Sequence, residues 1–133
     1  MGLRFKVSDD EIYDKLFEKF NCLILRNFDP DQGNFEDLLK SQGDTKKIIV
    51  FGNQAWTNIN KRDCYAYGTK VFMLVQQEQT DTIDNFVNGV IEVLWDLDFD
   101  IESATFGRAE DTGGVSLEAC EIVAGSPMVK EGQ

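Results

Sequence analysis

The sequence feature that most constrains the fold is an apolar stripe between residues 83 and 94. Its members recur at i, i+3, i+4, i+7, i+8 and i+11, and they are Ile83, Phe86, Val87, Val90, Ile91 and Leu94. This spacing predicts a helix with one buried face, with residues 80–82 available as caps. Gly89 interrupts the helix at a cost of about 1 kcal/mol relative to alanine. Either a close contact with the sheet or with another subunit, or a tolerated local weakness, explains it.

A second helix is predicted over residues 9–20. Ser8 and Glu11 have the spacing of a capping box, and apolar residues follow at helical spacing: Ile12, Leu16, Phe17 and Phe20. Residues 22–25 form a short apolar run that is either a strand or a continuation of the helix. Residues 26–45 are polar and rich in turn formers, with one or two helical turns at 35–39. We expect a plain surface loop or an interaction loop there.

The remaining apolar runs predict strands. Residues 46–52 (KKIIVFG) read as a buried strand, which residues 54–60 extend or pair with, and residues 63–77 read as a long strand. Gly68 within it indicates a bulge or a crossover. Residues 99–108 and 115–124 form a hairpin joined by residues 109–114. The resulting fold class is α+β, a mainly antiparallel sheet with two helices packed on one face. We expect a single α+β domain over residues 1–124 and a flexible C-terminal tail over 125–133.

The charge of the chain is strongly asymmetric. Its 133 residues hold 13 Lys+Arg and 24 Asp+Glu, for a net charge of −11. After residue 70 the only bases are Arg108 and Lys130, so the negative charge lies in the second half. Binding of nucleic acid through a basic face is therefore disfavoured. The acids either form a solvated face or a surface that repels a polyanion or attracts a basic partner.

No motif predicts catalysis, a metal or a cofactor. The chain has no histidine, and its cysteines, at 22, 64 and 120, are too far apart for a Cys-x-x-Cys site. We expect reduced, partly buried thiols in a soluble, intracellularly made protein with no membrane segment. Acids alternate with apolar residues over 96–102, yet the sixth position of a calcium loop would be Ile101 instead of glycine. A half-exposed strand entry fits better, with a magnesium site as the lesser alternative.

The order of these elements resembles the tail terminator (tail-completion) proteins of long-tailed bacteriophages. The resemblance covers residues 8–124 and rests on a capped helix followed by KKIIVFG, CYAYGTKVFMLVQQEQ, DTIDNFVNGVIEVLWDL and ESATFGRAEDTGGVSLEACEIVAG. It implies a non-enzymatic virion protein at the head-proximal end of the tail, made in the host cytoplasm. Members of this family form a ring, usually a hexamer, that stops tail-tube polymerisation. The implied partners are further copies of the chain, the tail tube protein and the head–tail connector.

In such a ring, DNA must pass without specific binding. We expect some of the acids to face the channel and repel the polyanion, the candidates being Asp96, Asp98, Asp100, Glu102, Glu110 and Asp111. The competing interpretation leaves them on the outer wall, where they serve solubility. Two other functions stay open: another head–tail joining or protein-binding domain, and a small metal-dependent hydrolase that uses the acids of 96–102.

Overall fold

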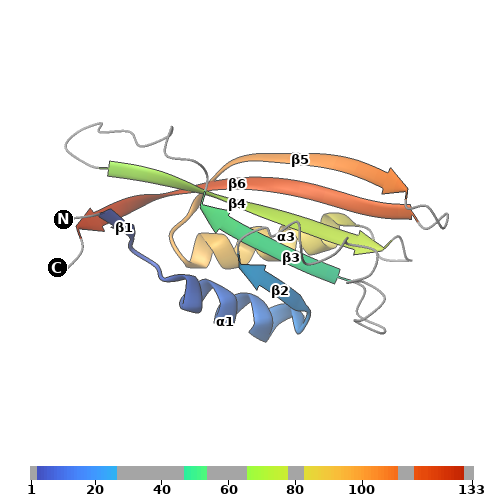
Figure 1. Cartoon of the computed structure of the whole chain (residues 1–133), viewed down its shortest axis with the longest axis horizontal. Coiled ribbons are helices and arrows are strands. Elements are labelled where there is room, and N and C mark those ends of the chain that lie inside the picture. The colour runs from blue at the N-terminus through green and yellow to red at the C-terminus, as the bar shows by residue number, and fades with distance from the viewer. Residues whose placement is uncertain (1–2, 27–46, 54–65, 78–82, 111–115, 131–133) are drawn as a thin grey trace.

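The computed structural model describes residues 3–26, 47–53, 66–77, 83–110 and 116–130. Two helices and six strands occur in these ranges (Figure 1). In chain order they are β1 (Leu3–Phe5), α1 (Asp9–Phe20), β2 (Leu23–Arg26), β3 (Lys47–Asn53), β4 (Ala66–Gln77), α3 (Ile83–Asp96), β5 (Asp100–Glu110) and β6 (Ser116–Lys130). The predicted α+β class is confirmed.

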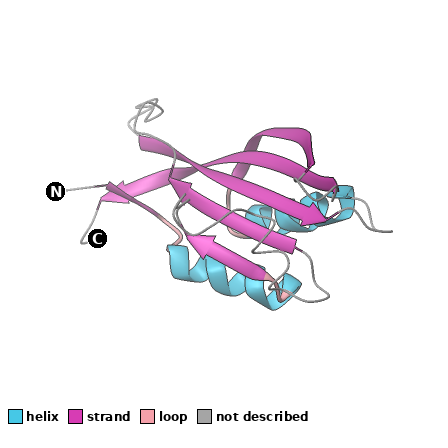
Figure 2. Ribbon diagram, turned by 45° about the vertical axis from the view of Figure 1, so that its right-hand side comes forward, coloured by secondary structure: helices cyan, strands magenta, loops and turns pink. Residues whose placement is uncertain are grey.

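The six strands form one mixed sheet in which β6 has the most neighbours. The order is β1-β6-β4-β3-β2, and β5 also pairs with β6. Since β4 occupies one edge of β6, both β5 and β1 lie along the other edge. The pairing of β2 with β3 is parallel, whereas the other four pairings are antiparallel. Figure 2 shows the long strands as a twisted layer with the two helices beside it.

The prediction of a flexible tail from residue 125 is wrong for residues 125–130. β6 continues to Lys130 and pairs with β4 up to Met128 and with β1 over its last three residues. Ser126 and Met128 are buried. The small and polar composition of this stretch favours fraying only where no neighbouring strand is present. Here β1 and β4 supply backbone partners on both edges, and the three residues of β1 are too few for a periodic pattern.

Helix α1 begins and ends where local chemistry predicts. The Oγ of Ser8 accepts a hydrogen bond of 3.2 Å from the backbone N–H of Glu11, which is the expected cap. Asn21 ends the helix in the left-handed conformation, with φ of 48°, a role that asparagine tolerates. The helix predicted over residues 9–20 is confirmed. The apolar run at 22–25, left open as strand or helix, belongs to strand β2.

Helix α3 is two residues longer than its apolar stripe and ends in a defined turn. Asp98 has φ of 64°. The backbone N–H of Asp98 donates to the carbonyl of Trp95, and the backbone N–H of Phe99 donates to the carbonyl of Leu94. These two bonds form a Schellman motif, with an aspartate where glycine is usual. At the other end, the Ile83 N–H donates to Glu118 Oε2 at 3.1 Å. The caps predicted at residues 80–82 lie outside the described residues.

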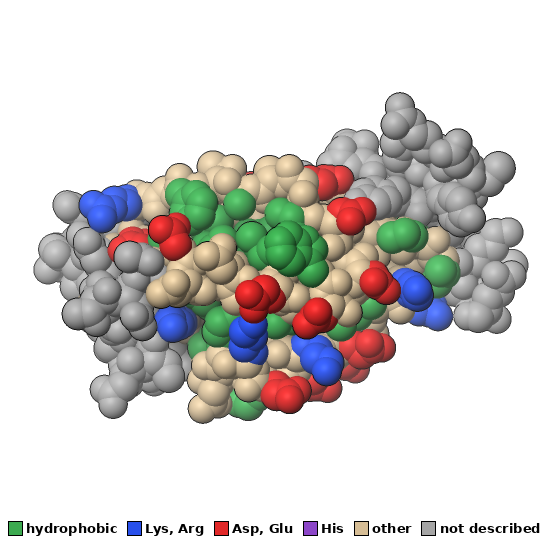
Figure 3. All heavy atoms as spheres, turned by 180° about the vertical axis from the view of Figure 1, so that it is seen from behind, with side chains coloured by type: hydrophobic (Ala, Val, Ile, Leu, Met, Phe, Trp, Pro, Cys, Tyr) green, Lys and Arg blue, Asp and Glu red, His purple; other side chains and the backbone are tan. Residues whose placement is uncertain are grey.

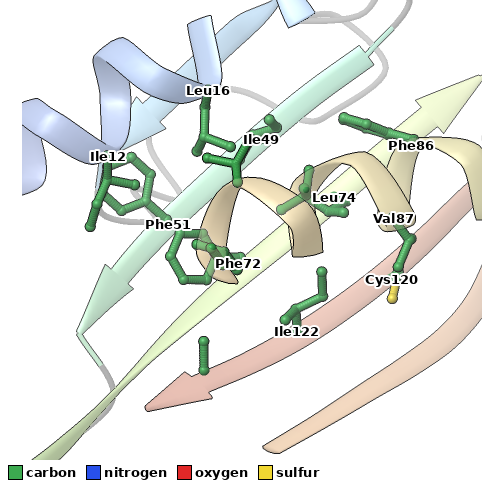
Figure 4. Close-up of a cluster of buried hydrophobic side chains, with 14 of the residues drawn as sticks. Ile12, Leu16, Ile49, Phe51, Phe72, Leu74, Phe86, Val87, Cys120 and Ile122 are labelled. Atoms are coloured by element: carbon green, nitrogen blue, oxygen red, sulfur yellow. The ribbon is translucent and has the colours of Figure 1, made fainter. Parts of the chain in front are cut away.

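Both helices contribute to one core cluster with the sheet (Figure 4). Helix α1 contributes Ile12 and Leu16, and helix α3 contributes Phe86, Val87, Val90 and Leu94. These side chains pack with alternate residues of β3, β4 and β6, namely Ile49, Phe51, Phe72, Leu74, Cys120, Ile122 and Ala124. The intervening positions form a second cluster of Ile48, Val50, Val75 and Leu117. Both faces of β3 are therefore buried, which explains its continuous apolar sequence. The strand predicted over residues 46–52 is confirmed over its described residues, 47–52.

Two glycines make room for aromatic side chains. A Cβ on Gly89 would lie 2.8 Å from Phe20 Cζ, so a contact with helix α1 explains this glycine, in place of the contact with the sheet or a subunit that was expected. A Cβ on Gly68 would lie 2.6 Å from Met128 Sδ and 3.0 Å from Phe5 Cζ. The pairing of β4 with β6 runs through Gly68 without a shift. Gly68 therefore marks a close approach, and the bulge or crossover expected there is absent.

Three predicted segments lie outside the described residues: the excursion beyond Arg26, residues 54–60 and the hairpin loop from Asp111 on. The two strands that this loop joins are β5 and β6, which pair antiparallel as predicted.

Candidate assembly surface

Four of the six candidate channel acids lie together where α3 passes into β5. Asp96 is the last residue of α3, Asp98 occupies the turn, and Asp100 and Glu102 lie in β5. All four are exposed. The strand expected over 96–102 is therefore wrong for residues 96–99, because the helix and its Schellman turn extend through them. The alternation of burial still holds, since Leu97 and Phe99 are buried.

The other two candidate acids are not part of this group. Glu110 is the last residue of β5, and at 3.3 Å per residue its backbone lies about 30 Å along the strand from Asp100. The side chain of Glu110 and the whole of Asp111 lie outside the described part of the chain. The structure thus brings together the four acids of 96–102 and separates Glu110 from them.

The described residues hold no group of three or more cysteine, aspartate or glutamate side chains arranged to bind a metal ion. The acids of 96–102 follow one another along a helix end, a turn and an extended strand, so their carboxylates do not converge on one point. Among the described helices, none has the length and apolar character needed to cross a bilayer.

The first exposed aromatic patch lies on α1 and is here called the α1–β2 flank, defined by Tyr13, Phe17 and Arg26. Phe17 is 43% exposed, although its spacing had assigned it to the buried stripe. Its ring stacks on Tyr13 with centroids 5.9 Å apart. The Arg26 guanidinium lies 5.1 Å from the Tyr13 ring centre and bonds to Asp10 at 2.6 Å. The aromatic pair therefore faces the β2 side of the helix.

The second exposed aromatic patch lies on α3 and is here called the α3 flank, defined by Ile91 and Trp95. Trp95 is 59% exposed. It stands about 120° around the helix from Gly89, the position that contacts α1. The two patches therefore lie on different helices and consist of different residues. Figure 3 shows exposed hydrophobic side chains with acidic ones around them on this side of the molecule.

A third exposed aromatic residue, Phe106 in β5, borders a shallow groove. Phe106 is 53% exposed. The groove has a volume of about 270 Å³ and is lined by Ile83, Phe106, Gly107, Arg108 and Glu118. Its carboxylate, Glu118, already accepts the hydrogen bond from the N-terminus of α3. Sequence patterns gave no indication of Trp95 or Phe106, because exposed aromatic residues follow no periodicity.

The described cysteines are buried and free. Cys22 is 4% exposed and Cys120 is fully buried. Burial raises the pKa of the Cys22 thiol to about 11, against the opposing effect of Lys47. Burial, followed by the nearby Asp84 and Glu121, also raises the pKa of Cys120. Both thiols stay protonated at neutral pH, the opposite of a catalytic cysteine. Cys64 lies outside the described residues.

No protein-family model matches this sequence, and neither does any curated protein sequence. The function must therefore be argued from the exposed surfaces.

Proposed function

We propose that this protein is a non-enzymatic structural component that resembles phage tail terminators and forms a closed ring. In that role the ring caps the tail tube, stops its polymerisation and joins it to the head–tail connector. One observation carries the proposal: the chain exposes two different aromatic patches, the α1–β2 flank on one helix and the α3 flank on the other.

Ring closure requires two unlike patches on each subunit, because a ring is built from head-to-tail contacts. A two-fold dimer, by contrast, buries the same patch on both copies. Phe17 on α1 and Trp95 on α3 supply two unlike apolar contacts. Aromatic residues of this kind commonly carry most of the binding energy of an interface. The contact proposed here sets Phe17 of one copy against Trp95 of the next.

The proposal includes the detailed arrangement of sheet and helices that the sequence predicts. It consists of a mainly antiparallel sheet with both helices on one face, and the core cluster shared by α1 and α3 supports it. Such an arrangement sets the two helices side by side, with Phe17 exposed on one and Trp95 exposed on the other. Neighbouring copies could then continue the helix layer around the ring.

The proposed channel role concerns the acids at the start of β5. Asp96, Asp98, Asp100 and Glu102 are exposed and close in sequence, so each copy would add one acidic group to the bore. Like-charge repulsion would keep DNA centred and mobile. Glu110 could line the same bore only if β5 runs along the ring axis. A reconstruction of the assembled tail tests this, and a neutral or basic bore would contradict it.

The ring itself is tested by mixing two variants. Phe17→Ser removes one patch and Trp95→Ser removes the other, so each variant alone should be monomeric in light scattering after size exclusion. An equal mixture retains one intact junction per pair and should give heterodimers without rings. If the interface were two-fold symmetric, mixing the two variants would give no heterodimers. Glu18→Ser, an exposed change on α1, is the control that should still form rings in electron micrographs.

The terminator role requires a further result. Rings added to polymerising tail tubes should bind one tube end and limit tube length. A wild-type protein that stays monomeric at all concentrations would contradict the proposal and favour a protein-binding domain instead. If rings form but tube length is unchanged, the ring assembly stands and the terminator role is wrong.

A further inference from the structure

No strand in the described part of the chain pairs with the outer edge of β5. Among the described strands, β5 pairs with β6 alone. Every residue from Glu102 to Arg108 is exposed, on both faces of the strand. Such an edge presents a row of backbone N–H and C=O groups that can pair with another chain. Stable proteins usually protect long edges, and here the one irregularity in the pairing of β5 is the bulge at Glu102.

Gly107 lies in this edge without any packing reason within the chain. The glycines at 68 and 89 accommodate Met128 and Phe20, whose atoms would lie within 3 Å of an added Cβ. A Cβ on Gly107 would meet nothing within 4 Å. A strand glycine that its own fold does not need often marks the close approach of another chain. In sheets, an aromatic residue on the adjacent strand can cover such a glycine.

The charge around this edge indicates the chemistry of its partner. Apart from Arg108 and Lys130, every charged residue in 83–110 and 116–130 is acidic. Asp100 and Glu102 lie at the start of the strand, and Glu121 is exposed on β6 opposite Thr105. A basic segment is attracted to this surface. The same edge of a second copy carries the same acids, so pairing of β5 with β5 is disfavoured.

We propose that an extended, lysine- or arginine-rich segment of a partner protein adds as a strand to β5 over residues 102–108 and covers Gly107 with a large side chain. Main-chain hydrogen bonds to the open edge give the affinity, and the acids and Gly107 give the specificity. The inference goes beyond the proposed ring, because the edge belongs to the sheet and the ring contacts belong to the helices. Binding should therefore be measurable on the monomeric Phe17→Ser variant.

The probe is a short blocked peptide in which lysine alternates with valine around a central tyrosine. Hydrogen exchange with and without the peptide should show new protection at the amides of residues 102–108. Affinity should fall with added salt, because the attraction between exposed charges is screened. A peptide with glutamate in place of lysine should bind about tenfold more weakly or worse. Methylation of the peptide nitrogens that face β5 should abolish binding, whereas methylation of the alternate nitrogens should not.

Two variants of β5 form a matched pair. Gly107→Val fills the open position with a branched side chain and should weaken the peptide about tenfold. It should still fold, because the Cβ meets nothing within 4 Å and position 107 is exposed. Thr105→Val is nearly isosteric, exposed and on the same face of the strand, and should bind as the wild type does. Thermal melting of both variants checks that the fold is intact.

Three results would overturn the inference. Protection that maps away from residues 102–108 would show that the peptide binds elsewhere. Equal affinity for the lysine and glutamate peptides would remove the charge argument. Protection of β5 that rises with protein concentration in the absence of peptide would assign the edge to a second copy. A protein that forms no rings but still passes the peptide tests would reject the ring and retain this site.

Discussion

The Lys70 ammonium donates a hydrogen bond of 2.8 Å to Asp9 Oδ1 and so links the middle of β4 to the first turn of α1. The Lys70 side chain is 2% exposed and that of Asp9 is 47% exposed. The ammonium also lies 4.2 Å from the centre of the Phe5 ring, which brings β1 into the same cluster. A cation buried to this extent requires such partners, because an uncompensated buried charge is strongly destabilising.

Removal of the Asp9 carboxylate should therefore destabilise the fold. We expect Asp9→Ala to lower the free energy of unfolding by about 2–3 kcal/mol, measured by urea denaturation. Glu11→Ala is the control, since it removes an exposed acid from the same helix turn and should cost under about 1 kcal/mol. Lys70→Met removes the need for a partner and should cost less than Asp9→Ala. Equal effects of Asp9→Ala and Glu11→Ala would show that the buried pair adds no stability.

The contact between Gly89 and Phe20 can be tested by a small enlargement. Gly89→Ala gains about 1 kcal/mol in helix propensity, yet its Cβ would lie 2.8 Å from Phe20 Cζ. Overpacking commonly costs about 1–3 kcal/mol, so we expect a net loss of stability in thermal melts. Asn88→Ala, at an exposed position of the same helix, should be neutral or stabilising. A double variant that adds Phe20→Leu should recover stability, and its failure to do so would disprove the contact.

Val87 tests the buried face of α3. It is 2% exposed and belongs to the core cluster shared with the sheet. Val87→Asp would bury a carboxylate without a partner and should cost several kcal/mol, about the whole stability of a small domain. Circular dichroism should then show an unfolded chain. Asn88→Asp, one position away on the exposed side, should melt near the wild-type midpoint, and similar behaviour of the two variants would show that this face is misassigned.

The buried thiols should react slowly in the native state. In a Cys64→Ser background, Cys22 and Cys120 should resist a thiol reagent at pH 8 until denaturant is added, because both are buried and the pKa of Cys22 is raised to about 11. Fast labelling of the native protein would contradict the burial of both side chains.

The raised pKa of Cys22 also predicts a pH dependence of stability. The ordinary pKa of a thiol is 9.0, against about 11 for Cys22 in the fold. Above pH 9 the unfolded chain loses a proton that the folded chain keeps, so stability falls as the pH rises from 9 to 11. Cys22→Ser should remove this part of the decline in denaturation curves at increasing pH. An unchanged pH profile in Cys22→Ser would contradict the assignment.

The helices and the long strands could be predicted from the sequence because their determinants are local. Ser8 caps α1 by a bond to Glu11, three residues away, and the apolar stripe of α3 repeats within one helix. The continuous apolar sequence of β3 arises because both of its faces are covered. The acids of 96–102 were recognised as exposed for the same reason, since their burial alternates with that of Leu97 and Phe99.

Contacts between segments that are far apart in the sequence could not be predicted from it. The parallel pairing of β2 with β3, the short β1 and the extension of β6 to Lys130 all depend on which strand edges meet. Phe17 fits the stripe of α1 by spacing, yet it is 43% exposed, because it lies about 100° around the helix from the buried Leu16 and stacks on Tyr13 instead. The separation of Glu110 from the other acids follows from the length of β5 alone, once the helix is known to continue to Asp96.

By itself, the sequence determined the two helices, the termini of α1, the long strands and the concentration of negative charge after residue 70. Each of these depends on periodicity, capping or composition within a few consecutive residues. Only the tertiary structure decided the order of the strands, the close contacts at Gly68 and Gly89, the exposure of Phe17, Trp95 and Phe106, and the open edge at Gly107. Those features depend on what lies across space from each residue, and spacing along a chain does not specify that.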